Sequence, residues 1–252
     1  MKSITLKSIT LKSIIMKKLS FVLLGIIFIS LSSCKKDKEV GEGAVVSEMR
    51  NPGNFAGIDL RTVGKLYFKQ EPNYKVEVIA QPNIQQVIET YVSNNQLVVK
   101  LKNNVRLGSH EPVRIMVSAP NLTKMRIGGS GDINTVGVLN VANLEMDIQG
   151  SGSIGVSDVT TGVVDAAISG SGSIVAYGTG TEARLKISGS GELNMEGLAV
   201  NKATTTTSGS GDIKVNAAQQ LNVTISGSGS VYYKGNPIIN SSTSGSGKIL
   251  HF

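Results

Sequence analysis

The sequence has no tryptophan, two histidines and one cysteine among its 252 residues. A zinc site built from clustered histidine and cysteine is therefore excluded. A disulfide within the chain is excluded as well, because it needs two cysteines. Aromatic residues make up only 4% of the chain, so few rings are available to form a sugar-stacking surface. Packing and backbone hydrogen bonds must hold the fold together.

The part of the chain that begins at Cys34 also lacks a large excess of positive charge. The net charge of +7 includes five lysines, and no acidic residue, before Cys34. The remainder carries 20 basic and 18 acidic residues, a net charge of +2. A nearly neutral chain has no electrostatic basis for binding nucleic acid.

Residues 1–33 have the pattern of an export signal. Lys17 and Lys18 precede an apolar run from Phe21 to Ile29, which is too short to span a bilayer. The following Leu31-Ser32-Ser33-Cys34 resembles the bacterial lipobox, in which cleavage precedes a cysteine that carries a diacylglycerol. We therefore expect a signal peptide at 1–33 and lipid attachment at Cys34. The alternative is an ordinary signal peptide with a chance cysteine.

Residues 34–44 combine mixed charges with glycine, which is typical of a flexible tether. Together with the lipobox, this predicts a lipoprotein of the Gram-negative outer membrane. It would face either the periplasm or the cell surface.

The tripeptide Gly-Ser-Gly recurs seven times at a spacing of 18 to 21 residues. Its first glycines are Gly129, Gly150, Gly170, Gly189, Gly209, Gly227 and Gly245. Apolar or β-branched residues occupy the second position before each first glycine and the fourth position after it. A Gly/Ser linker would not require apolar residues at fixed positions. Alternation at period two on both sides is typical of strands with one buried face.

Each unit is therefore predicted to be a strand, a Gly-Ser-Gly corner, a second strand and a second turn. A unit this short cannot enclose a core, whereas stacked units can. We expect an all-β protein whose residues 122–252 form a β-solenoid, similar to a parallel β-helix, with rungs of about 18–21 residues. The glycines would allow positive φ or close backbone approach, and the serines would hydrogen-bond along the stack.

Residues 45–121 lack the tripeptide but contain β-rich runs. These are Lys65–Phe68, Lys75–Ile79, Gln96–Leu101 and Val113–Val117, and residues 84–90 could form one helical turn. We predict that this part caps the solenoid.

The sequence resembles a known family, described as putative auto-transporter adhesin, head GIN domain. The resemblance covers roughly residues 54–252. It rests on Phe55-Ala56-Gly57-Ile58-Asp59, Leu97-Val98-Val99-Lys100, Val117-Ser118-Ala119-Pro120-Asn121-Leu122 and the Gly-Ser-Gly units. It implies a β-helix-like fold and an adhesive role, and it implies no catalytic residue.

Two carboxylates form the one weak candidate for a surface site. Glu192 and Asp212 each follow a Gly-Ser-Gly and should be neighbours on adjacent rungs. Such a pair could share a cation or act as acid and base, but a solvated face is the favoured interpretation. No metal site, cofactor or catalytic residue is predicted: the calcium-repeat likeness at 128–132 has its Asp one residue early, and no serine satisfies G-x-S-x-G.

The sequence therefore predicts a non-catalytic, envelope-anchored lipoprotein that acts as an adhesin-like or structural binding module. The alternative is a carbohydrate-binding or polysaccharide-processing β-helix protein. Expected partners are the membrane, through the lipid, and a glycan or envelope protein. The last Gly-Ser-Gly is followed only by Lys248 and Ile249–Phe252, with no polar cap, so we also expect self-association through the C-terminal rung.

Overall fold

The structure, a computed structural model, describes residues 37–252. The predicted signal peptide and Cys34 lie outside the described residues. Residues Lys38–Phe252 form one compact unit. Within the described range, no helix has the length and apolar character needed to cross a membrane.

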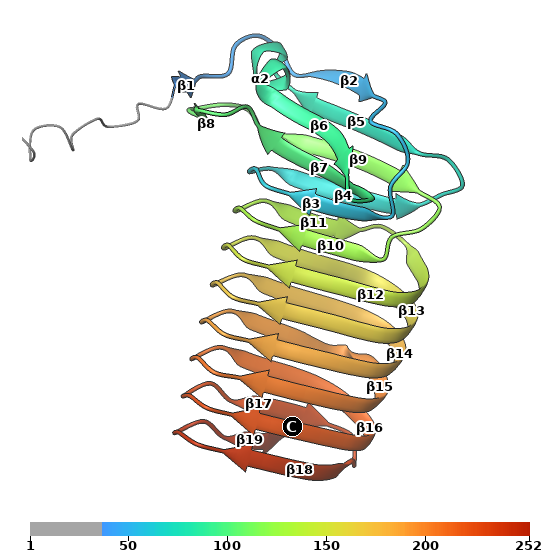
Figure 1. Ribbon diagram of the computed structural model, residues 1–252, viewed down its shortest axis with the longest axis vertical. Helices are drawn as coiled ribbons and strands as arrows, with labels where there is room; N and C mark the ends of the chain where they lie inside the picture. The colour runs from blue at the N-terminus through green and yellow to red at the C-terminus, as the bar shows by residue number, and fades with distance from the viewer. Residues whose placement is uncertain (1–36) are drawn as a thin grey trace, which may run out of the picture. The chain divides into compact units, whose positions relative to one another are not determined.

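The Gly-Ser-Gly units stack as rungs of a parallel β-solenoid (Figure 1). Every strand of this stack pairs in parallel with the strand one rung away. The predicted all-β solenoid is thus confirmed. Its strands are β10 (Lys124–Ile127), β11 (Asp132–Thr135), β12 (Val138–Ile148), β13 (Ser153–Ile168), β14 (Ser173–Ile187), β15 (Glu192–Thr207), β16 (Asp212–Ile225), β17 (Val231–Lys234), β18 (Ile238–Thr243) and β19 (Ile249–His251).

The middle rungs have one sharp corner rather than two, whereas the strands also break at residues 136–137, between β11 and β12, and at 235–237, between β17 and β18. Strands β13 to β16 run unbroken from one Gly-Ser-Gly to the next, and bend where the sequence predicted a second turn. Register shifts, such as the one between Val156 and Val159, absorb the differences in rung length at this bend. We call the outer surface of the strand segments that run into the corners the entry face. The outer surface of the segments that leave the corners is the exit face.

The predicted apolar columns form the core between the two layers. Buried side chains before the corners include Ile127, Ile148, Ile168, Ile187, Thr207 and Ile225, and those after the corners include Ile133, Ile154, Ile174, Leu193, Ile213 and Val231. The polar member of the first column, Thr207, is satisfied because its hydroxyl donates to the carbonyl of Gly211 at 3.1 Å. Aligned apolar columns give each rung a buried contact with the rungs on both sides.

The corner glycines are required by close approach of the backbones. A Cβ built on Gly189 would overlap the carbonyl oxygen of Gly170 in the rung before, and Gly170 stands in the same relation to Gly150. Positive φ is not the general reason, because only Gly245 among the seven first glycines has it, at +140°. The bond along this edge comes from the backbone, as when the amide of Ser190 donates to Gly170 at 3.1 Å, while the serine side chain is exposed.

The N-terminal part adds two rungs that are out of sequence order. Strands β3 (Gly57–Leu60) and β4 (Lys65–Gln70) form a rung against β10 and β11, with residues 61–64 as its corner. Strands β7 (Gln96–Leu101) and β9 (Arg114–Ala119) come later in the chain but pair in parallel on the other side of β3 and β4. The chain therefore builds outward before it returns to start the regular repeats.

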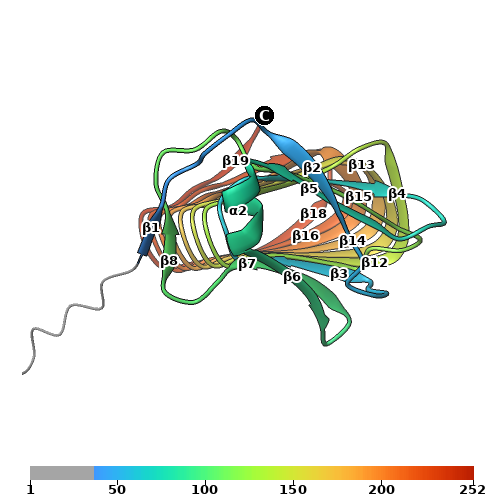
Figure 2. The ribbon, with the colours of Figure 1, turned by 90° about the horizontal axis from the view of Figure 1, so that it is seen from above.

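Antiparallel strands and one helix cover the N-terminal end of the stack (Figure 2). Strand β6 (Ile88–Ser93) pairs antiparallel with β7, β5 (Lys75–Ala80) with β9, and β2 (Val46–Arg50) with β5. Helix α2 (Pro82–Val87) lies over the core and buries Ile84 completely. The helical turn predicted at 84–90 thus starts earlier and gives way to β6 at Ile88.

The part of the predicted tether that the structure describes contacts this cap. The side-chain amide of Asn83 donates to Glu39 Oε1 and to the carbonyl of Val40, both at 2.7 Å. The amide of Gly41 donates to Ser109 at 2.8 Å. A short sheet of β1 (Asp37–Glu39) and β8 (Val105–Leu107) lies beside these contacts. Residues 39–41 are therefore held against the cap.

The opposite end of the stack has no comparable cover among the described residues. Every residue of β18 is exposed, and Ile238 reaches 74%. Two inward positions of this rung carry Ser241 and Thr243, partners of the buried Val223 and Ile225. Two of the apolar columns thus end on polar side chains that tolerate water.

Candidate functional site

The predicted pair Glu192 and Asp212 lies on the exit face, at the start of β15 and β16. The two residues are register partners, as the repeat spacing predicts. Glu192 Oε1 accepts a hydrogen bond from Lys214 Nζ at 2.9 Å, and Asp212 Oδ1 accepts one from the amide of Ser230 at 2.7 Å. Both carboxylates therefore already have partners within the stack.

The lysine that pairs with Glu192 could have been found from the sequence. Lys214 lies two residues after Asp212, so it shares the outer face of β16 and is a diagonal neighbour of Glu192. The hydrogen bond to Glu192 and its negative charge raise the pKa of Lys214 above the ordinary lysine value. The pair is thus an ion pair on a half-exposed surface.

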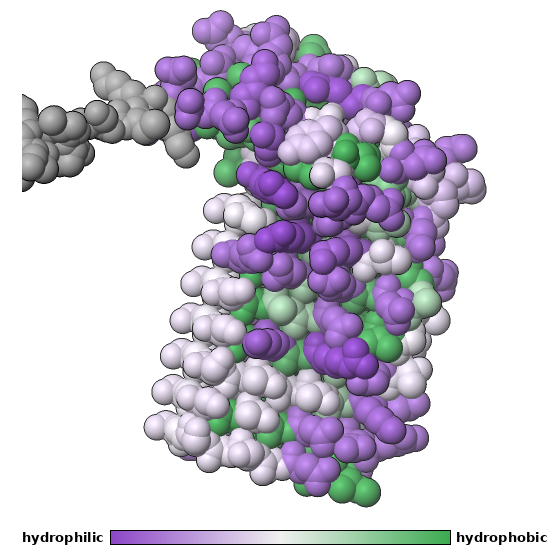
Figure 3. Space-filling model, viewed as in Figure 1, coloured by the Kyte–Doolittle hydropathy of each residue, from purple (hydrophilic) through white to green (hydrophobic). Residues whose placement is uncertain are grey.

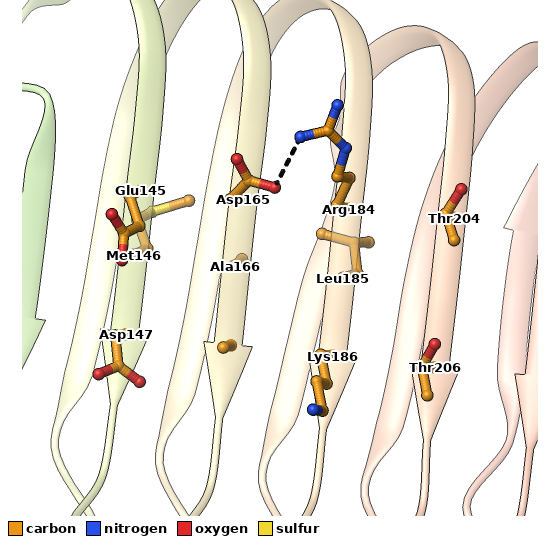
Figure 4. Close-up of a pocket in the computed structure, with 11 residues that line it drawn as sticks. Glu145, Met146, Asp147, Asp165, Ala166, Arg184, Leu185, Lys186, Thr204 and Thr206 are labelled. Carbon is orange, nitrogen blue, oxygen red and sulfur yellow. Dashed lines mark ion pairs between the residues drawn. The ribbon is translucent and has the colours of Figure 1, made fainter.

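A larger polar site lies on the entry face, over β12 to β15. Here the surface forms a hollow of about 550 Å³ (Figure 4). Its charged and hydroxyl side chains are Glu145, Asp147, Asp165, Arg184, Lys186, Thr204 and Thr206. A second hollow of about 500 Å³ borders it and shares Glu145, Asp165 and Arg184. Figure 3 shows hydrophilic side chains gathered on this face, beside the pale edge of glycine and serine corners.

The charges of this site change sign along the solenoid axis. One column follows the register Glu145, Asp165, Arg184, Thr204, and the next follows Asp147, Ala167, Lys186, Thr206. Carboxylates therefore lie over β12 and β13, cations over β14, and hydroxyls over β15.

Ion pairs occupy part of this site. Lys124 Nζ lies 2.7 Å from Glu145, and Arg126 Nε lies 3.4 Å from Asp147. Arg184 lies 3.5 Å from Asp165 and 2.8 Å from Glu182. The hydrogen bond to Glu182 and the charge of both acids raise the pKa of Arg184 above its ordinary value. Among the described residues, Lys186 takes part in no ion pair.

The sequence interpretation did not identify this site, although a signal was present. Charged residues recur at the fifth and third positions before the first glycine in the repeats that begin at Gly129, Gly150 and Gly189. Both positions have the same parity as the exposed face of the strand. The signal emerges only when the outward residues of successive repeats are aligned, because each strand by itself carries only one or two of these charges.

Neither the exit-face pair, Glu192 and Asp212, nor the set of carboxylates on the entry face forms a metal site. Residues 37–252 contain no group of three or more histidine, cysteine, aspartate or glutamate side chains placed to hold a metal ion. The carboxylates of the entry face are spread over adjacent rungs instead.

A family model described as "Putative auto-transporter adhesin, head GIN domain" matches residues 54–237. The chain belongs to this family. The match covers both the out-of-order N-terminal rungs and most of the Gly-Ser-Gly stack, so it includes both candidate sites. The resemblance inferred from the motifs is confirmed, and the family description supports an adhesin-like binding module with an envelope or surface location.

Solved structures share the whole fold. A "putative adhesin" from Bacteroides fragilis matches with a TM-score of 0.82 and 25% identity, over 85% of this chain and 100% of that one. A "putative adhesin" from Parabacteroides merdae has a TM-score of 0.70 and 18% identity, over 86% and 99%. A "putative lipid binding protein" from Parabacteroides distasonis has a TM-score of 0.70 and 22% identity, over 86% and 100%. No curated protein matches the chain.

Proposed function

We propose that this chain is a non-catalytic, adhesin-like binding module, held by a lipid on Cys34 at the outer membrane of a Gram-negative bacterium. The observation that supports it best is a stack of rungs whose core is filled and whose polar site lies open to solvent on one face. A module of this kind displays a repeated surface without enclosing a substrate. The family description agrees with such a role.

The absence of catalysis is part of this proposal. An acid and base pair needs a carboxyl group that is free to exchange a proton with substrate. Glu192 instead pairs with Lys214, and Asp212 accepts a backbone amide. We expect no turnover on a panel of envelope glycans. Glycan cleavage that disappears in Glu192→Gln would contradict the proposal and favour a polysaccharide-processing enzyme.

The anchor is supported by the lipobox alone, since Cys34 lies outside the described residues. We expect cells fed a fatty-acid probe to label the wild-type protein and not Cys34→Ala. The variant should accumulate as the uncleaved precursor. Equal labelling of both proteins would disprove lipid attachment at this residue.

We also propose that two copies associate through the rung formed by β17, β18 and β19. No described strand pairs with the outer edges of β18 and β19, one on each layer, and Ile238 and Leu250 are exposed beside these edges. A second copy related by a two-fold axis offers two strand edges at the same separation as those of β18 and β19. A single bound peptide offers only one strand edge.

Light scattering of the soluble domain tests this association. The wild type should be dimeric, and Ile239→Glu should be monomeric because it places a charge at the open end of the core. Val138→Glu is the matched control, because it changes an exposed apolar residue away from this end and should remain dimeric. A wild type that stays monomeric at every concentration, or a monomeric Val138→Glu, would contradict the proposal.

A further inference from the structure

Ion pairs within the fold do not involve all the charges that line the hollow on the entry face, since Lys186 takes part in none among the described residues. Along one column, Asp147 and Lys186 are two rungs apart, and Ala167 lies between them. Two rung spacings amount to roughly 10 Å, well beyond an ion pair. Figure 4 shows Asp147 and Lys186 on separate strands, and the short side chain of Ala167 lines the hollow with them.

Like charges also lie next to one another around this space. Glu145 and Asp165 are register partners, and such carboxylates destabilise a strand pair. On β14, Arg184 and Lys186 project from the same face. Lys124 and Arg126 offset part of the acidic charge from the rung before, and a positive group over the acids with a negative group over the cations would reduce the repulsion that remains.

The composition of the hollow excludes several other ligand classes. No aromatic side chain lines it, so it offers no stacking surface for a neutral sugar. The three carboxylates would repel a polyanion. A bare metal ion is not favoured either, because no metal-holding group occurs within residues 37–252.

We propose that this hollow binds a short zwitterionic peptide, with the ammonium group over Asp147 and Asp165 and the carboxylate over Arg184 and Lys186. An extended chain spans about 3.3–3.6 Å per residue, so two or three residues bridge the two charged regions. Arg184 can bind a carboxylate through two parallel N–H donors. Thr204 and Thr206 lie beside the cations and offer hydroxyl hydrogen bonds to the same end.

This inference rests on the proposed binding role and names its ligand class. Calorimetry of the full soluble domain with trialanine tests it, alongside N-acetyl-trialanine and trialanine amide, which each lack one charge. The free tripeptide should bind at least about tenfold more tightly than either blocked form, because each loses one charge-assisted contact. Equal affinity of the three peptides, or no saturable binding of trialanine, would overturn the inference.

Matched lysine variants locate the site. Lys186→Ala should weaken trialanine binding about tenfold. Lys202→Ala, an exposed lysine on the adjacent strand β15 but outside the hollow, should leave it unchanged. Equal effects of the two variants would overturn the assignment. A parallel cell-adherence assay separates the two ideas, since adherence without peptide binding overturns only this inference, and peptide binding without adherence overturns only the adhesin-like role.

Discussion

The two ends of the solenoid differ in how the outermost rung and its apolar core are covered. At the N-terminal end, α2 and the antiparallel strands β2, β5 and β6 cover the last parallel rung, and Ile84 is fully buried. At the other end, no strand within residues 37–252 pairs with the outer edges of β18 and β19, and Ile238 is 74% exposed. Each rung covers the core of the rungs beside it, but an end rung has a neighbour on one side only. Each end therefore needs a covering element that the repeat does not contain.

The difference also separates two sources of stability. In the middle, identical corners approach so closely that only glycine fits. At the N-terminal end, irregular side-chain contacts hold the cap, as when Gln85 Nε2 donates to the carbonyls of Val46 and Val78 at 2.8 and 2.9 Å. At the C-terminal end, the close approach of the corners continues to Gly245, but the described residues add no such cap.

The largest expected effect comes from adding one methyl group to a middle corner. Gly189→Ala places a Cβ against the carbonyl of Gly170 and should lower the free energy of unfolding by about 3 kcal/mol or more. Urea denaturation measures it.

Gly129→Ala is the matched control, because the rung before it has no Gly-Ser-Gly. A Cβ there would be 3.4 Å from the backbone of Arg61 and Thr62, an ordinary contact. The change should stay within about 1 kcal/mol. Gly41 is not a usable control, since a Cβ on it would overlap the side chain of Gln81. Equal losses in Gly129→Ala and Gly189→Ala would show that close stacking is not what requires glycine.

The next effect compares isoleucines at the two ends. Ile84→Ala removes a fully buried side chain under α2 and should cost about 2–4 kcal/mol. Ile238→Ala, at 74% exposure, should change the stability of the monomeric domain by less than about 0.5 kcal/mol. Similar losses by urea denaturation would mean that the C-terminal rung is covered as well as the cap.

Sequence reasoning succeeded where the fold is periodic. Period-two alternation around each Gly-Ser-Gly places Ile148, Ile168 and Ile187 in one buried column, and the structure has them there. The aligned spacing also predicts that Glu192 faces Asp212. Local pattern was sufficient because each rung repeats the environment of the one before.

It could not predict what depends on long-range pairing. Nothing in 45–121 shows that β7 and β9 stack outside β3 and β4, because those rungs share no tripeptide. The bend that replaces the second turn depends on register shifts, which period-two patterning does not encode. The entry-face site required comparison of outward residues across rungs, since Asp147 and Lys186 meet the hollow from different strands.

The smallest expected effect concerns the predicted exit-face pair. Lys214 and Glu192 are 35% and 45% exposed, so Lys214→Gln should change the free energy of unfolding by only about 0.5 kcal/mol or less. Because folding raises the pKa of Lys214 above 10.5, the contribution is fully present below that pH and is lost as the pH rises through the raised value. Denaturation of both proteins across this range checks the sign, and a difference that grows with pH would contradict it.

Native-state hydrogen exchange tests the contrast between the two ends most directly. It should be measured by mass spectrometry at a concentration where light scattering finds single chains. Amides of β18 should exchange at least about 100-fold faster than those of β7, because β7 lies between β3 and β6 at the covered end, whereas β18 pairs with β16 alone among the described strands. The β18 amides should become protected as the concentration rises and copies associate. Strand β18 as slow as β7 in the monomer would contradict the account.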